Sequence, residues 1–182
     1  MSDHPPGPRI GSLCTGYGGL DLAVELVLGG QVAWYAETDR HARTVLEHHW
    51  PDVPNLGDIR TVDWPRVPPV DVLTAGFPCQ DISNAGKRAG ITGANSSLWS
   101  SVADAVRVLR PPVVFVENVA ALRRRGLDVV HADLAALGYD TGWLCLRASD
   151  IGAAHRRDRL FLLATPATRG AADTDAADTL RP

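Results

Sequence analysis

Short apolar runs alternate with stretches of helical periodicity along this chain. Residues 9–14 form the first apolar run, and glycines then lead into a helical stretch at 20–28. A second run at 31–36 precedes another helical stretch at 38–49, which Thr38 is expected to cap. An alternation of strands and helices at this spacing is typical of βαβ units, so the pattern predicts an α/β fold.

The same alternation continues through the rest of the chain. It predicts a seven-stranded, mostly parallel sheet of the Rossmann-like kind, with helices on both faces. The further strands are expected in the proline-containing region 51–57 and at 70–75, 113–116, 139–146 and 159–164, and the further helices at 98–109 and 127–137. We expect one domain at 9–165, a flexible N-terminus at 1–8 and a disordered polar tail at 166–182.

Bulk composition narrows the class of protein. A length of 182 residues fits one domain, and 45% hydrophobic residues are enough for a packed core. No apolar run approaches the roughly 18–20 residues of a membrane span, and no signal pattern opens the chain. We therefore expect no membrane contact and a cytoplasmic location, in a bacterium or in the host of a phage. Three widely spaced cysteines without a CxxC pair predict neither a disulfide framework nor a metal site.

The positive charge is nearly all arginine, and it is clustered. The net charge of −3 argues weakly against a nucleic-acid partner, but Lys87 is the single lysine. Arginines gather at 123–125 and again in the run Arg156-Arg157-Asp158-Arg159. Arginine favours bidentate contacts to phosphates and base edges, so both clusters are candidate DNA contacts. The alternative for each cluster is a solvated surface, and a GC-rich coding genome would also favour arginine.

A glycine turn after the first predicted strand is the first candidate site. Gly16, Gly18 and Gly19 allow a tight turn and a close backbone approach to a ligand. Glu37, at the end of the second strand, is placed to accept both ribose hydroxyls of a nucleoside, and Asp58, at the end of the third, to accept from an adenine amino group. The absence of a phosphate-binding fingerprint favours an adenosine cofactor without phosphate. The alternative is an ordinary structural turn.

Cys79 and Glu117 are the candidate reactive groups. Cys79, in Pro78-Cys79-Gln80, follows a strand at the sheet edge where open α/β sheets bind ligands, and it lies in a polar loop. That position favours a nucleophile over a buried structural cysteine, and Arg157 and Arg159 are candidates to stabilise its thiolate. Glu117 is expected just after the strand at 113–116, where it would contact and protonate a base. A helix cap or a surface charge is the alternative for Glu117.

In this order, these segments resemble the DNA cytosine-5 methyltransferase family. Gly16-Tyr17-Gly18-Gly19 resembles its first motif, and Gly76-Phe77-Pro78-Cys79-Gln80 with Ser83 resembles its catalytic loop. Glu117-Asn118-Val119 is similar to its glutamate motif, and His155-Arg156-Arg157-Asp158-Arg159 to its arginine motif. The likeness runs from about residue 10 to residue 164. It implies the methyltransferase variant of the fold and methyl transfer to C5 of cytosine in DNA.

The resemblance also implies the role of each candidate residue. S-adenosyl-L-methionine would be the cofactor and S-adenosyl-L-homocysteine the product. Cys79, Glu117, Arg157 and Arg159 would be catalytic. The cofactor would lie against Cys14, Thr15, Gly16, Tyr17, Gly18, Gly19, Leu20, Glu37, Thr38, Asp58, Ile59, Gly76, Pro78 and Leu98. DNA would contact Gln80, Ser83, Lys87, Arg88, Arg123, Arg124, Arg125 and Arg156.

The chain departs from the family pattern at a few positions. Cys14 stands where the family usually has a phenylalanine stacked on adenine, and His155 replaces a glutamine. The family normally continues into a target-recognition domain and a segment that closes the cofactor site. We therefore weigh three readings: a compact enzyme with short or relaxed sequence preference, a catalytic subunit that needs a partner polypeptide, and a non-catalytic DNA- or cofactor-binding derivative. In a variant of the first reading, the enzyme adds a group other than methyl and uses a different donor.

Overall fold

A computed structural model of the protein describes residues 7–78 and 97–168. The predicted α/β class is confirmed, with helices on both faces of one sheet. The strands are β1 (Arg9–Leu13), β2 (Gln31–Ala36), β3 (Val72–Ala75), β4 (Val113–Val119), β5 (Tyr139–Arg147) and β6 (Asp158–Pro166). The helices are α1 (Gly19–Leu28), α2 (Arg40–His49), α3 (Ser97–Leu109), α4 (Leu122–Arg125) and α5 (Leu127–Ala136), with 3-10 turns η1 (Trp64–Arg66) and η5 (Ala148–Ile151).

The strands lie in the order β2-β1-β3-β4-β6-β5. β2, β1, β3 and β4 run parallel, whereas β6 pairs antiparallel with both β4 and β5. The described residues form six strands, so the expectation of seven is wrong. In place of the short strand expected at 51–57, the structure has a single β-bridge between Tyr35 and Asn55. The nearby prolines have no N–H group with which to extend a ladder.

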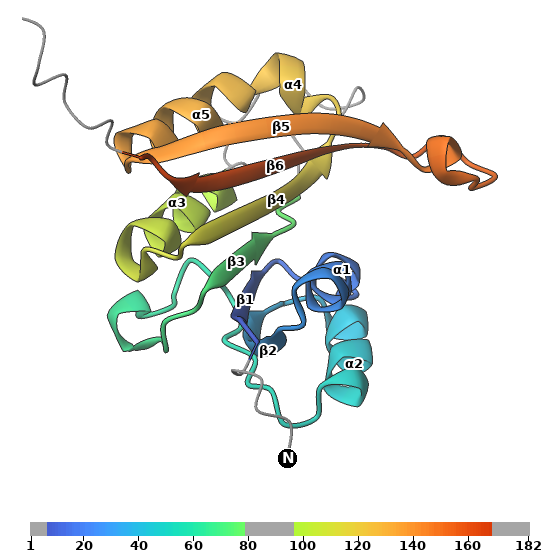
Figure 1. The fold of residues 1–182 in the computed structure, drawn as a ribbon. Helices are drawn as coiled ribbons and strands as arrows, with labels where there is room; N and C mark the ends of the chain where they lie inside the picture. The colour runs from blue at the N-terminus through green and yellow to red at the C-terminus, as the bar shows by residue number, and fades with distance from the viewer. Residues whose placement is uncertain (1–6, 79–96, 169–182) are drawn as a thin grey trace, which may run out of the picture.

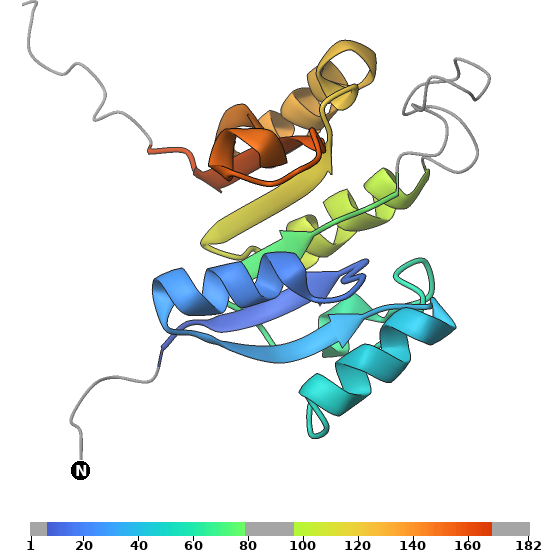
Figure 2. The ribbon, with the colours of Figure 1, turned by 90° about the vertical axis from the view of Figure 1, so that its right-hand side faces the viewer.

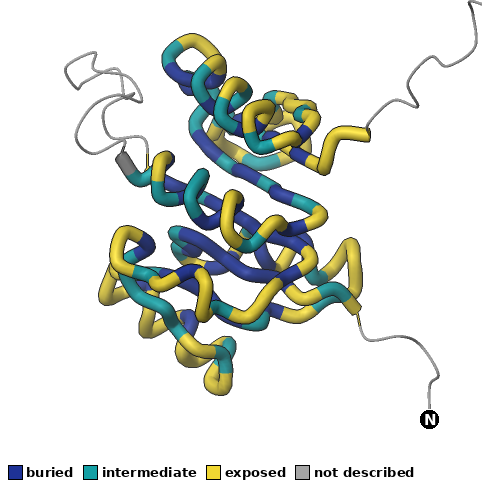
Figure 3. Tube along the Cα trace, turned by 90° about the vertical axis from the view of Figure 1, so that its left-hand side faces the viewer, coloured by how far each residue is buried: buried dark blue, intermediate teal, exposed yellow. Residues whose placement is uncertain are grey.

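Each face of the sheet has its own hydrophobic cluster. Helices α3, α4 and α5 lie on one side and α1 and α2 on the other (Figure 1). In the larger cluster, α3, α4 and α5 pack against strand residues such as Leu73, Val114 and Leu162. In the smaller cluster, α1 and α2 pack against Ile10 and Val72. Buried strands therefore form the centre, and exposed residues follow the outer helix faces and loops (Figure 3).

Local chemistry fixes where the first two helices begin and end. α1 lies between Gly18 and Gly29, which adopt left-handed φ angles of 80° and 68° that favour glycine. The cap of α2 is Asp39, whose carboxylate accepts from the N–H groups of His41 and Ala42. The prediction that Thr38 caps α2 is therefore wrong by one residue, because the carboxylate satisfies two free N–H groups at the helix start.

β4 is longer than the sequence predicts. Its parallel pairing with β3 ends at Ala75 and Val116, but its antiparallel pairing with β6 continues to Val119 and Arg159. Glu117 therefore lies within the strand, and the expectation that it follows the strand is corrected. The pairing with β6, which comes much later in the chain, adds the extra residues.

Part of the sheet face that carries α1 is open in the ranges that the structure describes. In Figure 2, α1 lies across β1 and the η5 segment lies above it. Beyond α1, Leu144, Leu146 and Leu163 of β5 and β6 are 50%, 47% and 48% exposed. Together with Leu20 and Ala23 of α1, they line a groove of about 700 Å³, which we call the open groove. No helix in the described residues is long and apolar enough to cross a membrane.

Candidate active site

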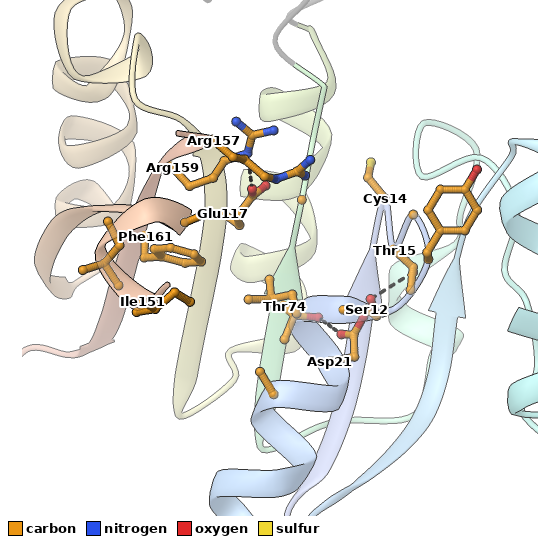
Figure 4. Close-up of a pocket in the computed structure, with 18 of the residues that line it drawn as sticks. Ser12, Cys14, Thr15, Asp21, Thr74, Glu117, Ile151, Arg157, Arg159 and Phe161 are labelled. Carbon is orange, nitrogen blue, oxygen red and sulfur yellow. Dashed lines mark hydrogen bonds and ion pairs between the residues drawn. The ribbon is translucent and has the colours of Figure 1, made fainter. Parts of the chain in front are cut away.

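A pocket of about 600 Å³ lies between the glycine turn and the ends of β4 and β6. The turn between β1 and α1 forms one wall, and the segment that follows β5 forms the opposite wall (Figure 4). Both walls carry residues far apart in sequence, because β1, β3, β4 and β6 are neighbours in the sheet. The lining consists of Ser12, Cys14, Thr15, Gly16, Tyr17, Gly19, Leu20, Asp21, Ala23, Thr74, Gly76, Glu117, Leu146, Arg147, Ala148, Ile151, Arg157, Arg159 and Phe161.

Glu37 holds the glycine turn from outside the pocket. It directly follows β2, as predicted, and its Oε2 accepts from the N–H of Gly16 at 2.7 Å. Its Oε1 accepts from the N–H groups of Thr38 and Asp39 at 2.8 and 2.7 Å. Because a carboxylate offers about four lone-pair sites and three are used here, Glu37 keeps capacity for about one further donor, such as a hydroxyl. The contacts in the structure make it a brace for the turn.

Cys14 is an unreactive thiol at the rim of this pocket. Its φ of 51° lies in the left-handed region, which is uncommon for a residue with a side chain. Burial, assisted by the negative charges of Glu37 and Asp58, raises the pKa of the Cys14 thiol to about 12. The thiol is therefore neutral at physiological pH, which makes it a weak nucleophile. Asp58 pairs with Arg60 at 2.6 Å, and this hydrogen-bonded partner lowers the pKa of Asp58.

Glu117 and Arg159 form an ion pair that faces the glycine turn. Arg159 Nε lies 2.7 Å from Glu117 Oε1, and the two side chains are 24% and 25% exposed (Figure 4). Partial burial of this kind makes a charge-assisted contact stronger and more directional than a pair on the open surface. Arg157 also lines the pocket, where it is exposed. One carboxylate and two guanidinium groups are thus available to a polar ring in the pocket.

A cluster of buried polar side chains forms the floor of the pocket, and the sequence predicted only Thr15 among them. Asp21 is 1% exposed and accepts a short hydrogen bond from the hydroxyl of Thr74. The hydroxyl groups of Ser12 and Thr15 are hydrogen-bonded to each other, with their oxygens 2.9 Å apart. Burial raises the pKa of Asp21 to about 6, against the opposing effect of hydrogen bonds from Thr74 and Ser12. The sequence signal that could have indicated this cluster is Asp21, an acidic residue in an otherwise apolar stretch directly after the glycines.

The predicted site residues divide into three groups. The pocket brings together Cys14, Thr15, Gly16, Tyr17, Gly19, Leu20, Gly76, Glu117, Arg157 and Arg159. Outside its lining lie Gly18, Glu37, Thr38, Asp58, Ile59, Pro78 and Leu98, and the exposed or partly exposed Arg123, Arg124, Arg125 and Arg156. Cys79, Gln80, Ser83, Lys87 and Arg88 fall outside the described residues, so their roles stay predictions.

Asp21→Asn tests the buried floor through the pH dependence of stability. A carboxyl whose folded pKa is about 6 binds a proton more tightly in the folded than in the unfolded protein, where the value is 3.8. The contribution of Asp21 to the free energy of unfolding should therefore fall by on the order of 2–3 kcal/mol as pH rises from about 4 to above 6. The amide variant lacks this loss. Urea unfolding at pH 4 and pH 7.5 measures it, and identical pH dependence in both proteins would contradict the account.

Comparisons with known proteins find matches over most of this chain. The family model described as C-5 cytosine-specific DNA methylase matches residues 9–175. The type II methyltransferase M.HhaI of Haemophilus parahaemolyticus is 35% identical over 161 residues, which cover 86% of this chain and 49% of that protein. M.DsaV of Dactylococcopsis salina is 32% identical over 155 residues, covering 83% and 44%. The chain thus spans about half the length of these relatives.

Solved structures show the same fold at lower identity. The Dnmt2 methyltransferase of S. pombe superposes with a TM-score of 0.74 at 18% identity, covering 90% of this chain and 52% of that one. The methyltransferase EhMeth of Entamoeba histolytica also gives a TM-score of 0.74, at 16% identity, with 88% and 53% covered. With a family model that matches most of its length, the chain belongs to the C-5 cytosine-specific DNA methylase family.

Proposed function

We propose that this chain transfers a methyl group from S-adenosylmethionine to C5 of cytosine in DNA. The observation that carries the proposal is the Glu117–Arg159 pair, which faces the pocket across from the glycine turn. β3, the strand beside β4, leads directly into Pro78 and Cys79 in the sequence. The carboxyl group proposed for the edge of a base thus lies on β4, and the cysteine proposed for its ring follows the adjacent strand β3 in the sequence.

The pocket suits an adenosine cofactor without phosphates. Its turn has the backbone freedom for a close approach, and Glu37 keeps acceptor capacity beside it for a ribose hydroxyl. When bound, S-adenosylmethionine supplies an electrophilic methyl group on a sulfonium. Cys14 would contact the base of the cofactor as a neutral thiol, and S-adenosylhomocysteine would leave as the product.

The chemistry requires a nucleophile because C5 of cytosine is itself a poor one. The Cys79 thiolate attacks C6, and the electron pair of the 5,6 bond moves toward C5 and the N3 edge. Glu117 binds that edge and donates a proton to N3. C5 would then accept the methyl group that the cofactor supplies. A base would remove the C5 proton, the N3 proton would return to Glu117, and the thiolate would leave as the double bond re-forms. Arg159 holds the carboxyl of Glu117, as its 2.7 Å contact indicates.

The target base must leave the stack before this reaction, at a cost of a few kcal/mol in a duplex. Arg157 lines the pocket and is exposed, so its guanidinium is available to a base that enters there. Arg123, Arg124 and Arg125 form the basic turn α4, and Arg123 and Arg124 are exposed there. We propose that this turn and Arg156 contact the phosphate backbone, which would make DNA affinity fall with salt.

Cys79→Ala tests the proposed reaction. Without the thiolate no adduct forms, so transfer of labelled methyl groups to DNA should fall by at least about a thousandfold, as losses of catalytic nucleophiles do. Cys145→Ala is the matched control, because Cys145 is a partly buried cysteine on β5 that does not line the pocket. Full activity of the Cys79 variant, or equal loss in both variants, would contradict the role of Cys79.

Glu37→Gln tests the brace beneath the cofactor. The amide keeps the shape but loses one acceptor oxygen and the negative charge, so the Kd for S-adenosylmethionine should rise about tenfold or more, a loss of roughly 1.4 kcal/mol. Glu25→Gln is the control, since Glu25 also accepts from a backbone N–H, that of Val32, at 3.1 Å. Calorimetric titration measures both constants, and an unchanged Kd for the Glu37 variant would remove it from the cofactor site.

A second candidate is a catalytic subunit that works with another polypeptide. The observation that favours it is the open groove, where Leu144, Leu146 and Leu163 leave apolar area exposed. Apolar patches of this kind mark interaction sites, and strands buried on one face only leave such a patch. Leu146 and Phe161 line both the groove and the pocket, so a chain seated there would also form a wall of the pocket.

Leu163→Asp separates the two candidates. If a partner polypeptide seats in the open groove, the chain alone should be weakly active, and the second half of M.HhaI supplied in trans should raise transfer at least about tenfold. The charged variant should lose this increase while unfolding at the same urea concentration, because Leu163 is half exposed. Full activity of the chain alone, with no response to the added polypeptide, would exclude the subunit reading.

A further inference from the structure

Asn118 is a buried polar side chain that the proposed reaction leaves without a role. It follows Glu117 on β4, and successive residues of a strand point to opposite faces of the sheet. Glu117 faces the pocket, whereas Asn118 is 3% exposed on the face that carries α3 and α5. A buried amide is costly unless its donor and acceptor are both satisfied, so its partners show what it holds.

Both groups of the Asn118 amide are used. Its Nδ2 donates to the carbonyl oxygen of Phe77 at 3.1 Å, and its Oδ1 accepts from the N–H of Val119 at 2.8 Å. Reversing the amide would set oxygen against the Phe77 carbonyl and NH₂ against the Val119 N–H, so chemistry fixes its orientation. The amide therefore joins the end of β4 to the chain that follows β3.

Phe77 lies just beyond the sheet. The ladder between β3 and β4 ends at Ala75 and Val116, and Phe77 comes two residues later. Its ring is buried and packs against Trp99 of α3, with ring centroids 5.5 Å apart. Trp99 is held in turn, since its Nε1 donates to Asp133 of α5 at 2.7 Å. The Phe77 ring is thus fixed by α3, and its carbonyl by Asn118.

We propose that Asn118 is a positioning residue that fixes the nucleophile relative to Glu117. Phe77 and Pro78 lead directly into Cys79, and Asn118 is covalently next to Glu117. The Asn118 amide therefore fixes the point at which the chain that leads to Cys79 leaves the sheet. It fixes this point relative to β4, the strand that carries Glu117. The inference rests on the proposed function, and it assigns the middle residue of Glu117-Asn118-Val119 a task distinct from that of its neighbour.

The expected effect is on the chemical step. Misplacing a reacting group by about 1 Å can cost on the order of a hundredfold in rate, whereas cofactor binding at the glycine turn does not involve Asn118. Asn118→Ala should lower kcat by roughly 10- to 100-fold and leave the KM for S-adenosylmethionine within about twofold of the wild type.

Tyr139→Phe is the matched control for lost stability. Its buried hydroxyl donates to the backbone carbonyl of Pro111 at 2.8 Å, so the variant also removes one buried bond to a carbonyl, away from the pocket. It should unfold at a lower urea concentration than the wild type and keep the wild-type kcat. An equal loss of kcat in the Tyr139 and Asn118 variants would reduce Asn118 to a structural residue and overturn the proposal.

Asn118→Asp adds a readout that a merely structural role would not move. The carboxyl is isosteric and still accepts from Val119 N–H, but only its protonated form donates to the Phe77 carbonyl. The ratio of variant to wild-type kcat should therefore rise as pH falls from 8 to 6. A flat ratio would overturn the proposal even if the alanine variant failed to fold.

The outcomes also separate this inference from the proposed function. Transfer that depends on Cys79 but is unchanged by Asn118→Ala would overturn the positioning role alone. A rise in the KM for S-adenosylmethionine with unchanged kcat would also overturn the positioning role, because it would assign Asn118 to cofactor binding. Wild-type protein that transfers no methyl group under any condition, with or without the added polypeptide, would overturn both.

Discussion

The pairing of β4 with two different neighbours is the constraint on which the rest of the site depends. Its parallel partner, β3, ends early and releases the chain toward Cys79, while its antiparallel partner, β6, continues to Val119. The extra residues keep Glu117 in a pleated strand, where its side chain faces the pocket. Because Val119 pairs with Arg159, the guanidinium falls diagonally beside Glu117 and forms the ion pair.

Electrostatics differ sharply between the two walls of the pocket. On the side of β4 and β6, the negative charge of Glu117 is matched by Arg159, with Arg157 nearby. On the side of the glycine turn, Glu37 and the buried Asp21 are satisfied by backbone N–H groups and hydroxyls instead of cations. That wall retains a negative character, which suits a ligand that carries a positive sulfonium. The same burial keeps the Cys14 thiol neutral, so the turn presents no competing nucleophile.

Sequence reasoning predicted what local patterns encode. The glycine turn, Glu37 directly after β2, and the arginine run that leads into β6 all lie where the alternation of strands and helices put them. The sequence did not predict the features that depend on contacts between distant segments. The extension of β4 through Glu117 depends on β6, and the floor at Asp21 depends on Thr74 from β3. The strand at 51–57 failed because its prolines limit the pairing to one bridge. The tether from Asn118 to Phe77 joins residues 41 apart, which no local pattern predicts.

The central claim is that Cys79 attacks the cytosine that Glu117 holds, and a trapped adduct tests it most directly. DNA in which fluorine replaces the hydrogen at C5 can accept the thiolate and the methyl group but cannot lose fluorine as a cation, so the bond to sulfur persists. Mass spectrometry of the digested complex should find one methylated fluorocytosine on the peptide that contains Cys79, formed only when S-adenosylmethionine is present. Methylated DNA with no covalent adduct, or an adduct on Cys14 or Cys145, would contradict the account.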